Sequence, residues 1–115
     1  MPQEITRTQI EKYTVYTGPT AESFSPIMAG ITYPDPAYEI LVYRRPLCVF
    51  EYVLSGRGHI ERNGSILTVN AGDAYILTAG TYHHYYSDKV DPWTKIWFNA
   101  SGSLVQHLLS DYGLD

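Results

Sequence analysis

Short segments rich in β-branched and aromatic residues, separated by turns that contain glycine, follow one another between residues 38 and 99. The clearest turn is Asn63-Gly64, since both residues tolerate the positive φ of a two-residue β-hairpin. About seven strands spaced roughly 8–12 residues apart, with no helical period between them, predict a mainly β sandwich or closed barrel. The predicted strands are Tyr38–Tyr43, Val49–Leu54, His59–Arg62, Ile66–Val69, Ala74–Thr78, His83–Tyr86 and Lys95–Asn99.

The end of the chain changes to a helical period. Apolar residues recur there along one face, which predicts an amphipathic helix over residues 103–113. Ser103, with Gln106 three residues on, is expected to cap this helix, and Gly113 is expected to end it. The apolar stripe consists of Leu104, Val105, Leu108, Leu109 and Tyr112.

The 115 residues are expected to form a single domain, with an N-terminal arm at residues 1–25 containing one strand and a barrel at residues 26–99. A content of 44% hydrophobic and 17% charged residues excludes a disordered chain. No apolar run approaches the ~20 residues of a membrane span, and the chain does not start like a signal peptide, so we expect a cytoplasmic protein. A net charge of −4 argues against DNA binding by this chain alone.

Two stretches resemble the sequence motifs of cupins. Gly72–Ser87 resembles the second cupin motif, with its two glycines and His83 in register, although Thr78 replaces a proline and Ser87 an asparagine. Tyr52–Gly58 resembles the strand and turn that close the first cupin motif. The resemblance implies a cupin-like double-stranded β-helix, or jelly-roll barrel.

Metal-binding cupins place three ligands upstream of the glycine turn. The matching positions here hold Tyr43, Arg45 and Val49, none of which is a metal ligand of that type. One histidine, His83, is left, whereas a catalytic zinc or iron site needs about three protein ligands. Cys48, the only cysteine, cannot build a thiolate site alone. We therefore expect neither a metal nor another cofactor.

The stretch Asp91–Asn99, followed by Ser101-Gly102 and the predicted helix, resembles the N-terminal effector-binding and dimerisation domain of AraC-type transcription regulators. Together with the cupin-like motifs, this resemblance covers roughly residues 28–114. It implies a sensor that binds a small sugar-like effector inside the barrel and forms a homodimer through Leu104, Leu108, Leu109 and Tyr112. DNA would be bound only by a C-terminal part that is not in this chain.

The same resemblance implies that Trp97 stacks on the sugar while Tyr85 and Arg45 hold its hydroxyl groups, with Lys95 where a histidine stands in arabinose-responsive members. Alternation along strands separately puts His83 and Tyr85 on one face and Trp93, Lys95 and Trp97 on another. By the same count, a shared inward face is formed by Arg45, Val49, Glu51 and Val53. If Glu51 is buried, it needs a cationic partner such as Arg45 or Lys95. The candidate ligand-binding residues are Arg45, Glu51, His83, Tyr85, Lys95 and Trp97.

Two other interpretations stay open. A small cupin enzyme, such as a sugar isomerase or epimerase, would need an acid–base pair, for which His83 with Tyr85 or Glu51 is the available choice. A purely structural dimerisation module would have its barrel filled by its own aromatic residues, since side chains can fill a barrel of about eight strands. Trp97 is compatible with either a sugar platform or the core, whereas Trp93 is expected to plug the barrel end.

Overall fold

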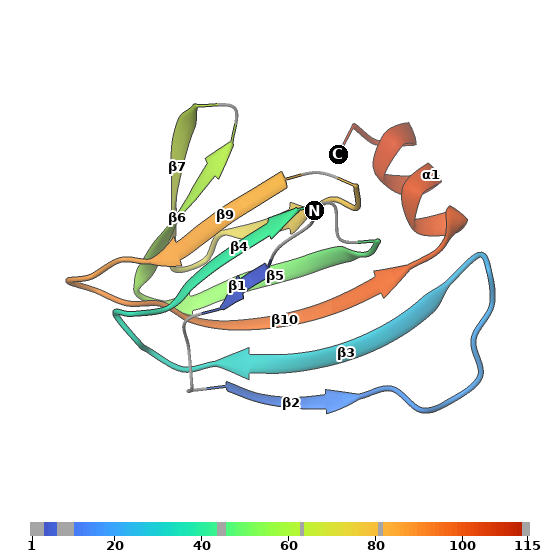
Figure 1. The fold of residues 1–115 in the computed structure, drawn as a ribbon, viewed down its shortest axis with the longest axis horizontal. Coiled ribbons are helices and arrows are strands. Elements are labelled where there is room, and N and C mark those ends of the chain that lie inside the picture. Colours follow the sequence, from blue (N-terminus) through green and yellow to red (C-terminus); the bar gives the residue numbers. More distant parts are fainter. Residues whose placement is uncertain (1–3, 7–10, 44–45, 63, 81, 114–115) are drawn as a thin grey trace.

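The computed structural model describes residues 4–6, 11–43, 46–62, 64–80 and 82–113. Within these residues the chain forms ten strands followed by one helix (Figure 1). The elements are β1 (Glu4–Thr6), β2 (Glu11–Val15), β3 (Ser25–Thr32), β4 (Glu39–Tyr43), β5 (Cys48–Ser55), β6 (Arg57–Arg62), β7 (Ser65–Asn70), β8 (Ala74–Leu77), β9 (Tyr82–Ser87), β10 (Thr94–Ser101) and α1 (Ser103–Asp111).

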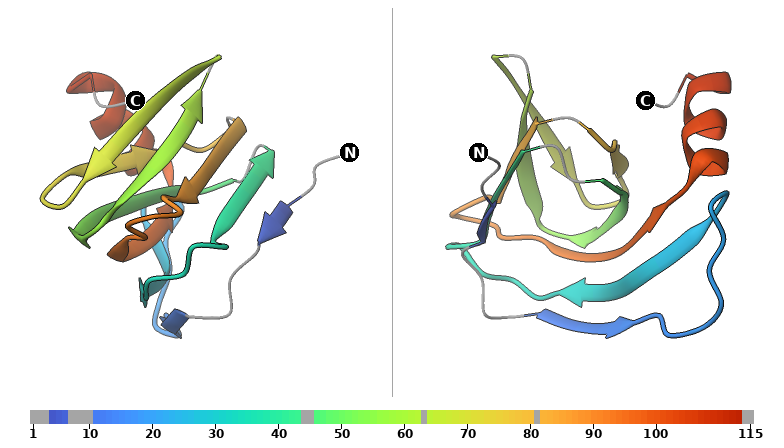
Figure 2. Two further views of the ribbon diagram at one scale, coloured as in Figure 1. Left: turned by 90° about the vertical axis from the view of Figure 1, so that its left-hand side faces the viewer. Right: turned by 45° about the vertical axis from the view of Figure 1, so that its right-hand side comes forward.

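The strands form two antiparallel five-stranded sheets. The first sheet has the order β1-β4-β9-β6-β7, and the second has the order β2-β3-β10-β5-β8. The two sheets face each other around the interior, and α1 lies outside them at the end of β10 (Figure 2). The chain passes between the sheets several times, as in a jelly roll, so the predicted mainly β jelly-roll fold is confirmed.

The predicted Asn63-Gly64 turn falls between β6 and β7, and Asn63 lies outside the described residues. Arg62 pairs with Ser65 across it, and Gly64 has a φ of 80°. Such a positive φ is the conformation that glycine adopts at little cost. The described parts of the arm predicted at residues 1–25 contain two strands where one was expected: β1 pairs with β4 at the edge of one sheet, and β2 pairs with β3 at the edge of the other.

The strand β3 was absent from the prediction. Pro26 and Gly30 both argue against a strand in the sequence, yet β3 lies between β2 and β10 in the second sheet. A Cβ atom at Gly30 would come within 2.6 Å of the Trp97 ring carbon Cζ2 and within 2.6 Å of the Lys12 carbonyl oxygen on β2. Glycine at this position therefore lets both the indole of Trp97 and the backbone of β2 lie close to β3.

Side chains that alternate inward from both sheets form the core. Val49, Glu51 and Val53 on β5 are buried, as their predicted common face requires. Trp93 is fully buried, and its ring covers Gly58 so closely that a methyl group there would overlap the ring atom Cε3. The expected role of Trp93 as a packing residue therefore agrees with its position.

The helix α1 packs on the outer face of the second sheet. Val105 and Leu109 from the helix form a buried cluster with Cys48 and Ala100. The predicted cap at Ser103 is wrong: the N-cap is Gly102, with no side-chain cap. Instead, the backbone N–H groups of Ser103 and Leu104 donate to the carbonyl oxygens of Glu22 and Ser23, at 3.2 and 2.9 Å. A neighbouring segment thus satisfies the first turn, which leaves no need for a capping side chain.

Candidate functional site

A cavity of about 160 Å³ lies between the two sheets. Both sheets contribute to its wall, which combines three aromatic side chains with two carboxylates and an amide. The lining residues are Glu11, Met28, Tyr38, Ile40, Val49, Glu51, Tyr85, Trp97 and Asn99. An interior space with aromatic walls and a few polar groups is the usual form of a small-molecule site.

The indole of Trp97 is held at its edge by a chain of hydrogen bonds across three strands. Its Nε1 donates to Oγ1 of Thr32 on β3, at 3.0 Å. The Thr32 hydroxyl in turn donates to Oε2 of Glu11 on β2, at 2.6 Å. Because Thr32 is fully buried, these contacts fix the ring orientation and leave its apolar face for the cavity.

Glu51 and Lys95 form an ion pair in the interior. The Lys95 ammonium contacts Oε1 of Glu51, and the same oxygen accepts a hydrogen bond from the Tyr75 hydroxyl at 2.7 Å. Tyr75 lies directly opposite Glu51 in the ladder between β5 and β8, which explains this contact. Burial, assisted by the Glu51 carboxylate, raises the pKa of Tyr75, so its hydroxyl keeps the proton that it donates.

The ammonium of Lys95 is also enclosed by aromatic rings. Its Nζ lies 4.2 Å from the ring centroid of Trp93, 4.5 Å from that of Tyr38 and 4.8 Å from that of Tyr85. We call these three rings the aromatic box. Burial lowers the pKa of Lys95, while the Glu51 carboxylate opposes that shift and the ring faces favour the cation.

The structure brings some of the predicted ligand-binding residues together and separates others. Glu51, Tyr85 and Trp97 line the cavity, whereas Lys95 lies behind Glu51 and does not line it. His83 is buried, and its Nε2 lies 2.9 Å from the carbonyl oxygen of Thr78, near the turn between β8 and β9. Arg45 lies outside the described residues.

Six lining residues were not among the predicted ligand contacts: Glu11, Met28, Tyr38, Ile40, Val49 and Asn99. Asn99 could have been found by strand alternation, because it follows Trp97 by two residues on β10. Its Oδ1 accepts a hydrogen bond from the backbone N–H of Met28, at 3.0 Å. Three of these residues, Glu11, Met28 and Tyr38, lie in segments for which the local sequence does not indicate how they pair with other strands.

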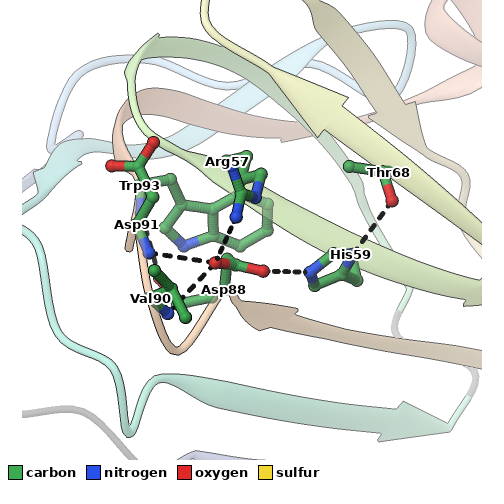
Figure 3. Close-up of polar contacts among 8 residues, drawn as sticks. Arg57, His59, Thr68, Asp88, Val90, Asp91 and Trp93 are labelled. Carbon is green, nitrogen blue, oxygen red and sulfur yellow. Dashed lines mark hydrogen bonds and ion pairs between the residues drawn. The ribbon is translucent and has the colours of Figure 1, made fainter.

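A second polar cluster surrounds Asp88, outside the barrel interior (Figure 3). Its carboxylate accepts from His59 Nε2 at 2.8 Å and from the backbone N–H groups of Val90 and Asp91 at 3.1 and 2.9 Å, and it pairs with Arg57 at 3.2 Å. These contacts, with that of His59 the strongest, hold the pKa of Asp88 well below its usual range. The cluster anchors the loop that leads to Trp93.

His59 also contacts the Thr68 hydroxyl through Nδ1, at 3.1 Å, so that hydroxyl, imidazole and carboxylate stand in a row. Such a row can activate a nucleophile when a substrate site adjoins it. Neither Thr68 nor His59 nor Asp88 lines the interior cavity. The row connects β6 and β7 with the loop that follows β9.

The exposed face of α1 and the neighbouring outer sheet face are apolar. Leu104, Leu108 and Tyr112 are 47%, 46% and 74% exposed, whereas Leu109 is 3% exposed. Leu109 therefore packs within its own chain, and its assignment to a dimer contact is corrected. The outer sheet face beside the helix carries Phe50 and Phe98, whose rings stack with centroids 4.6 Å apart, in a groove of about 450 Å³.

Among the described residues, no three His, Cys, Asp or Glu side chains are grouped to hold a metal ion. The described part of the chain also contains no helix with the length and apolar character to cross a membrane.

Solved structures share this architecture at low sequence identity. The cupin domain of Schizosaccharomyces pombe Cnp3 superposes with a TM-score of 0.59 and 14% identity, over 96% of this chain and 77% of that one. The polyketide cyclase RemF from Streptomyces resistomycificus superposes with a TM-score of 0.55 and 16% identity, over 78% of this chain and 62% of that one. These likenesses show the cupin fold.

Sequence comparison relates the chain to a specific family within this fold. It is 32% identical over 66 residues to the Msm operon regulatory protein of Streptococcus mutans, a match that covers 57% of this chain. The chain spans about a quarter of that protein's length, since the match covers 24% of it. The model of the AraC-like ligand binding domain matches residues 26–115, which include every strand from β4 to β10, α1 and most of the cavity wall. The chain therefore belongs to the AraC-like ligand-binding domain family.

Proposed function

We propose that this domain senses a small sugar in the interior cavity, as part of a cytoplasmic transcription regulator. The observation that carries the proposal is the cavity wall, in which the Trp97 indole stands beside tyrosine, carboxylate and amide groups. An indole face suits the C–H groups of a sugar ring, while the polar groups meet its hydroxyls.

The cavity volume supports a ligand of one ring. A dry protein cavity of about 150 Å³ holds benzene, and the volume here is about 160 Å³. Sites for larger ligands span roughly 300–1,000 Å³. A single pentose or hexose therefore fits the described space better than an oligosaccharide. Arg45 remains a proposed further contact from the segment next to β4.

Calorimetric titration with a panel of pentoses and hexoses tests the proposal. We expect micromolar to millimolar affinity, or about −4 to −8 kcal/mol, for at least one sugar. Trp97→Ala should abolish measurable binding, because it removes the stacking face. Tyr85→Phe should weaken binding about fivefold, as loss of one neutral hydrogen bond does. Tyr82→Phe, on the exposed side of the same strand, is the matched control and should bind as wild type does.

Two results would count against this proposal. Sugar binding that Trp97→Ala leaves unchanged would place the ligand elsewhere on the protein. No heat from any sugar would favour a barrel whose aromatic residues serve only as core.

We further propose that the domain dimerises through the exposed stripe of α1, formed by Leu104, Leu108 and Tyr112, and that a separate C-terminal part of the full regulator binds DNA. The exposure of this stripe supports the first point, and the resemblance to an operon regulatory protein supports the second. Leu108→Glu should shift the molar mass measured by light scattering toward the monomer. Gln106→Glu, which places the same charge on another exposed position of the helix, should leave the molar mass unchanged.

The enzyme alternative receives less support from the geometry. An isomerase would need His83 to share the cavity with Tyr85 or Glu51, yet the described contact of its Nε2 is with the Thr78 carbonyl and His83 does not line the space. Elemental analysis of the purified protein addresses the metal-dependent version. About one equivalent of zinc or iron that survives dialysis would revive it.

A further inference from the structure

Three of the four strands at the sheet edges carry a feature that opposes pairing with another chain. β1 has three residues and includes Glu4, β8 has four residues, and β2 carries Glu11 and Lys12. Short length and charged side chains are common means by which proteins prevent edge-to-edge association of sheets. The fourth edge strand is β7, at the free end of the first sheet.

β7 lacks both of these features. Its six residues, Ser65–Asn70, include no charged residue and no proline, and their pairing with β6 runs from end to end without a bulge. In the order of the described strands β7 is the last of its sheet, so its side away from β6 has no neighbouring strand. The hairpin of β6 and β7 extends beyond the neighbouring strands (Figure 1). An exposed edge of this kind can pair with a strand of another chain.

The exposed part of β7 is also apolar. Ile66 is 61% exposed and Leu67 is 60% exposed, and because they are consecutive they lie on opposite faces of the sheet. Val69, toward the other end of the strand, is buried in the barrel core. A strand added to this edge would therefore pair with the backbone and cover an apolar side chain on each face.

We propose that β7 pairs antiparallel with β7 of a second copy of this chain, so that the first sheets of the two copies become one continuous sheet. Two-fold symmetry of such a pair requires one residue to lie opposite itself. With Leu67 at that position, the two exposed leucines meet, and Ile66 lies opposite Thr68. Cross-strand pairs of this kind stabilise antiparallel sheets. The contact is separate from the α1 stripe and does not depend on sugar binding.

The charges at the two ends of β7 favour a second copy as the partner. Arg62, at the tip of the hairpin, and Asp73, in the turn that follows β7, are both exposed. An antiparallel pair centred on Leu67 sets the tip of each hairpin beside that turn of the other copy, so each Arg62 approaches an Asp73. Arg57, which lies at the same end of the hairpin as this turn, is already paired with Asp88.

Disulfide crosslinking tests the pairing and its register. Residues opposite each other in an antiparallel pair have Cα atoms about 4.5–5.5 Å apart, within the span of a disulfide. In single variants of the 115-residue chain, Leu67→Cys should therefore crosslink two copies at least about tenfold faster than Ile66→Cys or Thr68→Cys. Wild type, whose one cysteine is the buried Cys48, gives the background rate. Equal rates at the three positions, or rates no higher than the background, overturn the inference.

A measurement of association tests the same contact without cysteines. The interface is small, so we expect a dimer that forms only toward millimolar protein concentration. Sedimentation velocity of Leu108→Glu, a change that disrupts the α1 stripe, should still show this dimer. Adding Leu67→Lys should remove it, because a lysine on an edge strand opposes pairing. Val90→Lys makes the same change in charge at a loop position that is 87% exposed, and should leave the dimer intact. A dimer that persists with Leu67→Lys, or a monomer at every concentration of Leu108→Glu, overturns the inference.

Discussion

Thr32 is the residue on which the setting of the Trp97 indole depends. Thr32→Val keeps the shape but removes the hydroxyl, so the indole N–H loses its acceptor and Glu11 loses its donor. Leaving such buried groups unsatisfied should lower the free energy of unfolding by about 1–3 kcal/mol. Urea denaturation followed by tryptophan emission measures this. Thr14→Val, on the exposed strand β2, should change stability by less than about 0.5 kcal/mol.

Asp88 gives the fold a dependence on pH. Because the pKa of Asp88 is lowered in the folded state, the ionised group stabilises the fold at pH values above its unfolded pKa of about 3.9. That contribution is lost progressively as the pH falls below this value. Asp88→Asn should therefore lower the Tm at pH 7, and the difference from wild type should shrink toward pH 3. A difference that stays constant over this range would contradict the argument.

For individual residues, the sequence predicted which face of a strand a side chain lies on better than it predicted which groups that side chain contacts. Strand alternation put Glu51 on an inward face and Lys95 on one face with Trp97, and both placements agree with the structure. The rule that a buried carboxylate needs a cation named Lys95 as one possible partner. It did not predict that the pairing would withdraw Lys95 from the cavity. That result depends on Tyr38, Tyr85 and Trp93 meeting around one ammonium, and they come from three separate segments.

Among the elements, α1 has two apolar sides, and truncating a leucine on each side should lower the stability of the protein by different amounts. Leu109→Ala removes buried methyl groups from the cluster with Cys48 and Ala100 and should cost about 2–5 kcal/mol of stability. Leu108→Ala, one residue away on the exposed side, should cost less than about 1 kcal/mol in a monomer. Thermal denaturation of the two variants compares them. Equal losses would mean that the helix docks through a different face.

The element that sequence reasoning missed shows where local signals fail. Gly30 lowers the β propensity of β3, but its lack of a side chain is what admits Trp97, a residue 67 positions later in the chain. β7 and β6, by contrast, were predicted because the Asn63-Gly64 turn is encoded locally. When contacts with a distant segment determine the residues of a strand, that strand cannot be identified from its own sequence.

For the whole molecule, the net charge of −4 predicts that this chain does not bind DNA. Non-specific binding depends on lysine and arginine side chains that displace counterions from phosphates, and this chain has 12 acidic against 8 basic residues. A gel-shift experiment with the 115-residue chain in about 150 mM salt should show no complex, since exposed charges are screened beyond about 8 Å there. A shifted band would place a DNA-binding surface on the barrel itself.

The close contact between Gly58 and Trp93 has an evolutionary consequence. Since the indole occupies the space of any side chain at position 58, neither position can change freely while the other is kept. Among relatives that share this barrel, a glycine at 58 should accompany tryptophan at 93, and a larger residue at 58 should accompany a smaller one at 93. Two alignment columns 35 positions apart should thus vary as a pair, and relatives that break the pairing will have rebuilt the end of the barrel that encloses Lys95.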